Sequence, residues 1–507
     1  MKNNLLKSLV QILLAGTMCV LPVLGQTEKD LPTLAAMQRD LKGGETHSYR
    51  VQLTAGQFLN ARVEQENIDV ATVISGPDGK QITETDSPNE RWGSEPVLLV
   101  APTTGEYRVD VRSSSSSAPA GRYRIEIIAL RDATETDKAY ASAQLAFNEA
   151  RKIRAQQTVP ARRAAIEKYQ SALPLFQAAG DTYRRALTVL SIGITHYQLN
   201  ETRKALEYFD DTLAIARSLG NRRLEGIAES WVGGMLDILG DVAKALEHFN
   251  SALKLNRENG SQIGEGVALS NIGRIYENLA EWEKALEFYA QALQVFRAAG
   301  SKNSEAITLN NIGISYKLSG EYQKALDYLQ QSLPLFRAAK NKNSEAYTLL
   351  NIGSVYRRLN EFDKALAHYS QAQAIQRETN DRVQEGDTLD EIGATYSAQR
   401  QYEKALEYHS RAVEIQRAAA SVRREGMALT NLGEVYNSLG QPAKAMDQFT
   451  QALTIFRSIG DLDNAATALL GAAQAEQKRG NPPPFSPPTV ELLNRLERKY
   501  KKPQPSP

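Results

Sequence analysis

The sequence predicts a multidomain α + β protein in which a small antiparallel β-sandwich precedes a solenoid of paired α-helices. Hydrophobic residues alternate with a period of two from Leu41 to about Leu130, and from about Asp137 to Arg479 they recur every three or four positions. A forty-residue pattern also repeats through the helical part. Repeats of this length indicate a solenoid, in which each unit is stabilised by stacking on its neighbours.

The first 25 residues have the pattern of a secretory signal peptide. Lys2 and Lys7 precede an apolar run from Leu9 to Leu24, and cleavage is expected after Gly25. An uncleaved membrane anchor is the alternative, but the run is short for a bilayer span. We therefore expect an exported protein, periplasmic or extracellular in a bacterial envelope, with no stable membrane insertion after cleavage.

The only cysteine, Cys19, lies inside this apolar run. Lipidation of Cys19 is a second choice, because Met18 stands where a lipoprotein has a small residue. After cleavage the mature chain has no thiol, which excludes a disulfide, a thiolate nucleophile and a cysteine-ligated zinc site. The 60 basic and 59 acidic residues give a net charge of +1, which argues against a nucleic-acid-binding surface.

Residues 26–132 are predicted to form the sandwich, and Asp78 is interpreted as a turn residue rather than a calcium ligand. Six short runs alternate between apolar and polar residues: "HSYRVQL", "QFLNARVEQ", "IDVATVI", "PVLLVA", "EYRVDVR" and "RYRIEII". The segments "GGETHSYRVQLTAGQFLNARVEQ" and "PTTGEYRVDV" resemble the pre-peptidase C-terminal type of β-sandwich. That resemblance implies an accessory role, in binding or as a spacer, in a secreted protein.

Residues 133–480 are predicted to form the solenoid, with a degenerate unit at 133–180, seven units at 181–460 and a terminal helix at 461–480. The repeated letters "NIGxxY" and "KALexY" resemble the tetratricopeptide repeat in a longer, forty-residue form. The resemblance implies a right-handed α-α superhelix. Residues 481–507 are a Pro-rich tail, which holds eight of the 19 prolines and is expected to end the array.

Several residue types recur at one position of every unit and are expected to build the architecture. Glycine inside a helix costs about 1 kcal/mol against alanine, so the glycines at 193, 233, 273, 313, 353, 393 and 433 predict close helix contact. Glycine or asparagine at 200, 240, 320, 360 and 440 is expected to end a first helix in the left-handed conformation. Arginines at 217 and every forty residues to 457, and glutamates at 225 and every forty residues to 425, are expected to pair between units rather than to form a binding strip.

Recognition is expected where the units differ. In tetratricopeptide folds the first helix of each unit lines a concave groove, so the resemblance places positions 267, 270, 271, 274 and 278 and their forty-residue equivalents there. An asparagine at the 271 position suits the backbone of an extended peptide, because an amide both donates and accepts. The alternative is an asparagine that bonds a neighbouring helix. The candidate groove residues are Trp231, Asn271, Arg274, Asn278, Asn310, Asn311, Asn351, Arg358, Asp390, Glu391, Asn431 and Glu434.

The character of the expected groove changes along the chain. Apolar residues come first (Leu187, Leu190, Ile194, Ile227, Trp231) and acids come last (Asp387, Asp390, Glu391, Glu434). This order predicts a ligand with an apolar segment followed by a basic one, although Asp387 is also interpreted as an acid that stabilises a helix start. The lysine clamp with which chaperone-linked relatives hold a C-terminal carboxylate is not expected beside Asn271, Asn311 and Asn351.

Nothing in the sequence favours catalysis, a metal or a cofactor. The five histidines share no metal-binding spacing, and no metalloprotease, serine-hydrolase or phosphate-loop motif occurs. The combination of segments resembles the non-catalytic front portion of secreted proteins that carry a CHAT protease domain behind their repeats. The leading hypothesis is an exported, non-enzymatic scaffold that binds a protein or peptide. The alternatives are a regulatory or accessory subunit of a separately encoded protease or other enzyme, and self-association through the terminal units.

Overall fold

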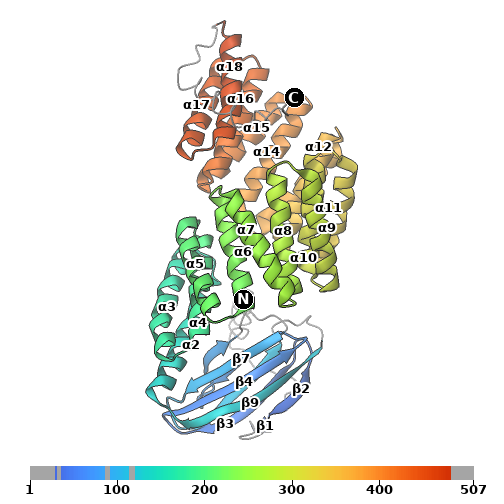
Figure 1. Ribbon diagram of the computed structural model, residues 1–507. Helices are drawn as coiled ribbons and strands as arrows, with labels where there is room; N and C mark the ends of the chain where they lie inside the picture. Colours follow the sequence, from blue (N-terminus) through green and yellow to red (C-terminus); the bar gives the residue numbers. More distant parts are fainter. Residues whose placement is uncertain (1–28, 31–35, 86–91, 114–119, 481–507) are drawn as a thin grey trace, which may run out of the picture. The chain divides into compact units, whose positions relative to one another are not determined.

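The computed structural model describes residues 29–30, 36–85, 92–113 and 120–480 (Figure 1). The expected signal peptide and the expected Pro-rich tail lie outside these residues. The chain divides into two compact units, residues 1–241 and 242–507. Unit 1 holds the β-sheets and helices α2 to α6, and unit 2 holds helices α7 to α18.

The N-terminal part of unit 1 consists of two β-sheets. One sheet has the strand order β1-β3-β8-β5-β6 and the other β2-β9-β4-β7. The strands are β1 Lys29–Asp30, β2 Met37–Leu41, β3 Thr46–Leu53, β4 Gln57–Glu66, β5 Val70–Ser75, β6 Gln81–Thr85, β7 Trp92–Val100, β8 Gly105–Ser113 and β9 Gly121–Asp132. Every strand pair among the described residues is antiparallel except β1 with β3, which is parallel.

All six expected strands are observed, and the structure adds three that the apolar pattern did not indicate. β1 has two residues, and β2 and β6 lie at sheet edges with only one or two apolar side chains each. An edge strand needs fewer buried residues, so its alternation is weak in the sequence. In the central strand β8, by contrast, Tyr107, Val109 and Val111 are fully buried between the sheets.

The first helix of unit 1 is anchored directly on the sheets. Helix α2, Glu135–Arg154, begins at a capping box in which Thr134 and Asp137 bond each other's backbone N–H. Asp137 also accepts hydrogen bonds from Arg131, the penultimate residue of β9. Further along α2, the Asn148 amide donates to the Thr85 hydroxyl of β6 at 2.9 Å. The β region and the first helices therefore pack as one body.

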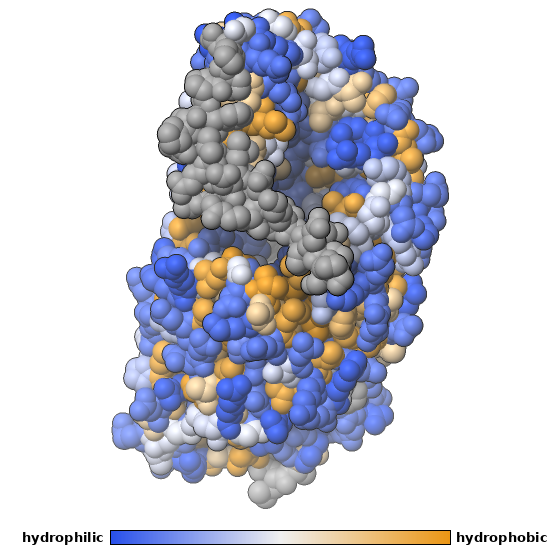
Figure 2. Space-filling view, turned by 45° about the horizontal axis from the view of Figure 1, so that its top comes forward, coloured by the Kyte–Doolittle hydropathy of each residue, from blue (hydrophilic) through white to orange (hydrophobic). Residues whose placement is uncertain are grey.

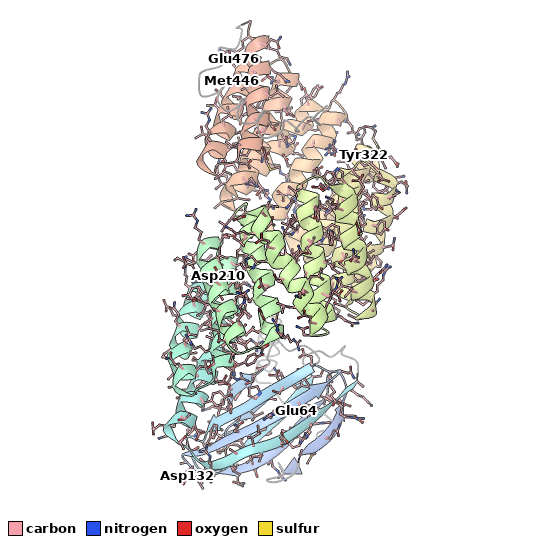
Figure 3. All side chains as sticks on the ribbon, viewed as in Figure 1. Glu64, Asp132, Asp210, Tyr322, Met446 and Glu476 are labelled. Atoms are coloured by element: carbon pink, nitrogen blue, oxygen red, sulfur yellow. The ribbon has the colours of Figure 1, made fainter. Side chains whose placement is uncertain are left out.

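The remaining helices form hairpins with three-residue connections, which fits antiparallel neighbours (Figure 1). Those of unit 1 are α3 Val159–Ala178, α4 Thr182–Gln198, α5 Thr202–Ser218 and α6 Arg222–Ile238. Those of unit 2 are α7 Val242–Glu258, α8 Gln262–Asn278, α9 Trp282–Ala298, α10 Lys302–Leu318, α11 Tyr322–Ala338, α12 Lys342–Arg358, α13 Phe362–Glu378, α14 Arg382–Ala398, α15 Tyr402–Ala418, α16 Val422–Ser438, α17 Pro442–Ser458 and α18 Leu462–Lys478. In Figure 3, the labelled Asp132 ends β9 and Tyr322 begins α11.

The expected close helix contact is confirmed at six of the repeated glycines, which are Gly193, Gly273, Gly313, Gly353, Gly393 and Gly433. A Cβ atom at Gly273 would lie 2.9 Å from the Tyr289 ring and 3.2 Å from the Ala285 carbonyl oxygen. At Gly313 it would lie 2.6 Å from Leu329 Cγ. These distances are too short for a real side chain, so the glycine lets the first and second helices of a unit approach and bury the ring between them.

The left-handed residues at the ends of first helices are also confirmed, with φ between 60° and 87° at positions 200, 240, 320, 360 and 440. Two equivalent positions hold residues without glycine's freedom, Ala280 at φ 58° and Arg400 at φ 61°. At the end of second helices Ala420 has φ 52°. The repeat geometry therefore imposes this conformation even where the side chain disfavours it.

Candidate functional site

In unit 2, the first helices of successive forty-residue repeats are joined by hydrogen bonds between their side chains. The Ser315 hydroxyl of α10 donates to Glu277 of α8, the Thr348 hydroxyl of α12 donates to Asn310 Oδ1 of α10 at 3.1 Å, and Asn431 of α16 reaches Asp390 of α14. Consecutive first helices are thus neighbours, and equivalent positions on α8, α10, α12, α14 and α16 form rows. We call the surface of these rows the first-helix face.

An apolar row crosses this face at the 267 position. Val267, Ile307 and Tyr347 are 38%, 42% and 39% exposed, although all three are large hydrophobic residues. Val267 and Ile307 lie one helical turn before Asn271 and Asn311, on the same side of their helices. Figure 2 shows the hydropathy of one side of the molecule, where orange hydrophobic residues lie among blue hydrophilic ones. Exposed apolar residues in register are typical of a surface that meets a partner.

The asparagines of the 271 position, which we call the amide row, divide into two free and two bonded side chains. Within the part of the chain that the structure describes, the half-buried amides of Asn271 and Asn311 have no hydrogen-bond partner. Asn351 is buried, accepts from Lys317 Nζ at 2.7 Å and donates to the Tyr347 carbonyl at 3.0 Å. Asn431 donates to Asp390 Oδ2 at 2.7 Å. The alternative interpretation, an asparagine that bonds a neighbouring helix, is therefore correct for Asn351 and Asn431 only.

The other polar candidates are less uniform. Asn310 is 5% exposed and accepts from Thr348, so it joins two helices instead of facing outward. Asn278 and Arg358 are exposed, and Arg274 is half-buried near Glu277.

Trp231 lies in unit 1, where its ring stacks on Phe209 with centroids 5.0 Å apart. Tyr197 meets the same indole edge-on at 5.6 Å. The apolar start of the expected groove is thus partly a packed cluster that includes the buried Leu190, whereas Ile227 is not part of this cluster and is 39% exposed.

Three charged residues of this face were missed in the sequence: Glu277, Lys317 and Arg357, each in the last turn of a first helix. Lys317 bonds Asn351, and Arg357 Nε donates to Glu391 Oε2 at 3.1 Å, so each reaches the residue 34 positions ahead. Asn437 repeats the spacing by donating to the Gly471 carbonyl at 3.0 Å. Comparing side chains 34 positions apart in the sequence, which is six fewer than the repeat length, would have indicated these pairs.

Burial shifts the titration of this central group. Burial lowers the pKa of Lys317, against the opposing effect of the Glu391 and Glu277 carboxylates. Burial raises the pKa of Glu277, while the Ser315 hydroxyl and the Lys317 and Arg274 cations act in the opposite direction. Glu391 also accepts from the Tyr369 hydroxyl at 3.1 Å.

The acids expected at the end of the groove are mostly bonded within the protein. Asp390 accepts from Asn431, and its other oxygen lies 2.6 Å from Nδ1 of the buried His409. Asp387 accepts from Gln416 Nε2 at 2.9 Å and Arg424 Nε at 2.8 Å, and burial raises its pKa to about 6. Only Glu434 of the four is exposed. The surface offered to a basic ligand segment is therefore smaller than the sequence implied.

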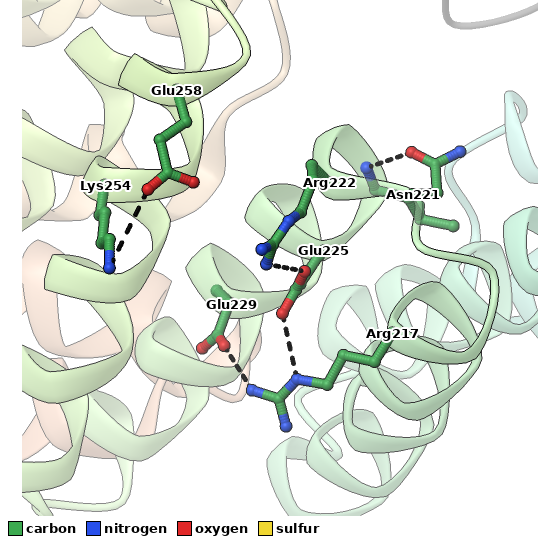
Figure 4. A network of polar contacts seen from close by, with 8 residues as sticks. Arg217, Asn221, Arg222, Glu225, Glu229, Lys254 and Glu258 are labelled. Carbon is green, nitrogen blue, oxygen red and sulfur yellow. Dashed lines mark hydrogen bonds and ion pairs between the residues drawn. The ribbon is translucent and has the colours of Figure 1, made fainter.

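The repeated charge pairs are structural, as expected. Each arginine from 217 to 417 donates through Nε to the glutamate eight residues ahead, at 2.7 to 3.2 Å. Figure 4 shows the pair in unit 1, where Arg217 bonds both Glu225 and the buried Glu229, and Arg222 also reaches Glu225. These pairs satisfy carboxylates at helix starts, so they leave no charge strip for a ligand.

Among the described residues no cluster of histidine, cysteine, aspartate or glutamate could hold a metal ion. No helix within the same residues is long and apolar enough to span a membrane.

Comparisons with known proteins agree with the repeat structure. A tetratricopeptide-repeat model matches residues 225–298, 264–338 and 344–418, and a second such model matches residues 428–459. The model of anaphase-promoting complex subunit 5 matches residues 166–237. No curated protein sequence matches the chain.

Several solved structures are similar to part of this chain at low sequence identity. The apo form of RapI has 16% identity and a TM-score of 0.46, with 54% of this chain and 98% of that chain covered. The apo quorum sensor NprR from B. thuringiensis has 15% identity and a TM-score of 0.49, with 64% and 89% covered. A Rap protein complexed with Competence and Sporulation Factor has 15% identity and a TM-score of 0.43, with 68% and 99% covered. The chain therefore has an N-terminal region of antiparallel β-sheet followed by paired helices that form tetratricopeptide repeats, which the family models match between residues 225 and 459.

Proposed function

We propose that this chain is an exported, non-enzymatic scaffold that binds an extended protein segment on the first-helix face of unit 2. Tetratricopeptide-repeat domains are in general scaffolds for proteins or peptides, and this chain carries them over most of unit 2. The observation that supports the proposal best is the pair of free amides at Asn271 and Asn311. These amides have no partner among the described residues and are not fully buried, so they are open to a ligand backbone that would replace the water they contact.

The apolar row gives the second part of the interaction. Side chains in an extended peptide alternate between opposite sides. One side can therefore lie on Val267 and Ile307 while the backbone bonds Asn271 and Asn311. Backbone bonds give affinity without selecting a sequence, and the apolar contacts select it.

We assign the β region a subordinate role, as a pre-peptidase C-terminal-like module that attaches or spaces the repeats outside the cell. Export rests on the sequence of residues 1–25, which a fractionation experiment tests: the protein is expected in the periplasm or medium, shortened by the signal peptide. A protein retained in the cytoplasm at full length would overturn this part of the proposal.

The binding proposal is tested with a library of random heptapeptides, acetylated and amidated, passed over the immobilised full chain. Retained peptides are identified by mass spectrometry. The double variant Asn271→Ala/Asn311→Ala is expected to retain at least about tenfold less, which corresponds to the loss of about two modest hydrogen bonds.

The control removes two amides from second helices, Asn250→Ala/Gln331→Ala, whose side chains bond only carbonyls of their own helices. It is expected to behave as the unmodified protein does. Equal retention by the two double variants would contradict the proposal.

A further inference from the structure

Most charged groups on the first-helix face of unit 2 have a partner of opposite charge or a hydrogen bond to an ionisable group. Arg357 is paired with Glu391 at 3.1 Å. Asp390 contacts His409 at 2.6 Å, and Asp387 contacts Arg424 at 2.8 Å. This pairing offsets the free-energy penalty of moving charge away from water.

Glu277, which accepts from the neutral Ser315 hydroxyl, and Lys317 are exceptions, and Lys317 is the cation of the two. Its ammonium group is half-buried and donates to a neutral acceptor, Asn351 Oδ1, at 2.7 Å. Among the described residues, no carboxylate lies within ion-pair distance of its Nζ atom. An ammonium group has three donors, so at least two remain for another acceptor.

The charges around Lys317 leave this part of the face net positive. Glu277 and Glu391 are the nearby carboxylates, whereas Arg274, Arg357 and Arg358 add to the charge of Lys317 itself. Glu391 is already bonded to Arg357 and Tyr369, and Glu277 to Ser315. An anion that approaches Lys317 therefore meets more positive than negative side chains, and the nearest carboxylates already accept hydrogen bonds within the protein.

The position of Lys317 links it to the proposed ligand path. Its Nζ atom contacts Asn351, the residue that follows Asn271 and Asn311 in the amide row. Lys317 belongs to α10, as Asn311 does, and its ammonium group lies against α12, so a peptide backbone that is bonded by the two free amides and continues toward α12 would approach it. The first-helix face also continues past it, to α14 and α16, so a chain end at this point is not required.

We propose that the extended ligand carries an acidic side chain, aspartate or glutamate, whose carboxylate binds Lys317. The inference rests on the proposed function of the same face. It replaces the basic ligand segment that the order of acids in the sequence predicts, because three of those four acids are bonded inside the protein. The interaction is charge-assisted and removes the uncompensated state of a half-buried ammonium group.

The test uses the same acetylated and amidated heptapeptide library on the full chain, with retained peptides sequenced. The unmodified protein is expected to enrich aspartate or glutamate at one internal position. Lys317→Gln removes the charge and is expected to reduce that enrichment at least about tenfold, the effect of losing one charge-assisted bond. Lys317→Arg keeps the charge and is expected to keep an acidic preference. Melting curves of both variants verify that they are folded.

The matched control is Lys324→Gln, which removes the same charge from the second helix α11, where Lys324 pairs with Glu321. This variant is expected to retain the acidic preference. Enrichment of acids that is unchanged in Lys317→Gln overturns the inference, as does enrichment of basic residues in the unmodified protein.

A parallel library with free C-terminal carboxylates separates the two sources of a carboxylate. If acids are enriched only as the free C-terminus, the internal side chain is the wrong assignment. If the unmodified protein retains no peptide above the Asn271→Ala/Asn311→Ala variant, the proposed function itself fails. If it retains peptides without acidic preference, only the present inference fails.

Discussion

Gln376 is a buried polar side chain in a position that four other units of the array, including that of Phe176, fill with phenylalanine. It lies in α13, is 1% exposed, and neither its amide nitrogen nor its amide oxygen has a hydrogen-bond partner. The equivalent residues Phe296, Phe336 and Phe456 are buried in the same place. The change Gln376→Phe is therefore expected to stabilise unit 2.

The expected magnitude combines two favourable contributions with one unfavourable contribution. Each buried polar atom without a partner costs about 1 to 3 kcal/mol, and burying a phenylalanine side chain contributes about 1.5 to 3 kcal/mol. The larger ring opposes this with a packing cost of about 1 to 3 kcal/mol. The residue thirty positions earlier packs against this site, as Gly266 does against Phe296. It is alanine both in the repeat of Phe336 (Ala306) and in this repeat (Ala346), so a phenylalanine ring is already accommodated beside alanine at an equivalent site. We expect a net increase of about 2 kcal/mol in the free energy of unfolding.

Urea unfolding followed by circular dichroism measures the change as an increase in the transition midpoint at unchanged slope. The matched control is Gln416→Phe, because Gln416 donates to the Val383 carbonyl at 3.0 Å and to Asp387 at 2.9 Å. That substitution loses two hydrogen bonds and is expected to stabilise less or to destabilise. A lower midpoint for Gln376→Phe, or equal gains for the two variants, would refute the reasoning.

Three further perturbations test the architecture. Gly313→Leu is expected to lower the free energy of unfolding by about 3 kcal/mol or more, because even a Cβ atom would lie 2.6 Å from Leu329 Cγ. The control Gly234→Leu, where a Cβ atom would meet nothing within 4 Å, should change the melting temperature little. Ala420→Gly is expected to raise the free energy of unfolding by about 1 kcal/mol, because glycine removes the backbone strain of alanine at φ 52°. Ala419→Gly, at an unstrained φ of −82°, is expected to lower it. Changes of the same sign for both variants in urea unfolding would contradict this reasoning. Asp387 has a pKa raised from 3.8 to about 6, so the native state binds its proton more tightly than the unfolded state and stability falls as pH rises from about 4 to 6. Asp387→Asn should remove this fall, by at most about 3 kcal/mol, and an unchanged pH profile of the urea midpoint would rule out the assignment.

Much of the fold follows from the sequence because every unit repeats the same local physics. The glycine at the 273 position and the aromatic ring at 289 predict a close helix pair, and the arginine and glutamate eight residues apart predict an ion pair across a turn. Both features are confirmed by distances in the structure. Edge strands such as β6 were not predicted, because Ile82 is the only apolar residue among its five and gives no alternating pattern.

The candidate site was harder to predict, because the state of each asparagine depends on a residue in another unit. Asn311 and Asn351 have the same repeat position and nearly the same neighbours in sequence. Asn351 is bonded because Lys317 stands 34 residues before it, whereas Glu277, at the same distance before Asn311, bonds Ser315 instead. Position in the repeat alone therefore cannot separate free amides from bonded ones.

The reach of a helix-end side chain into the following unit also limits how the units can be exchanged. A segment that carries Asn351 would lose its lysine donor if it were transplanted behind a unit ending in Glu277, and the amide oxygen Oδ1 of Asn351 would become available. Duplicating or reordering units would thus change which amides are free without changing the units themselves. The state of each amide is set at the junction between two units, and engineered arrays built from this chain would have to be designed two units at a time.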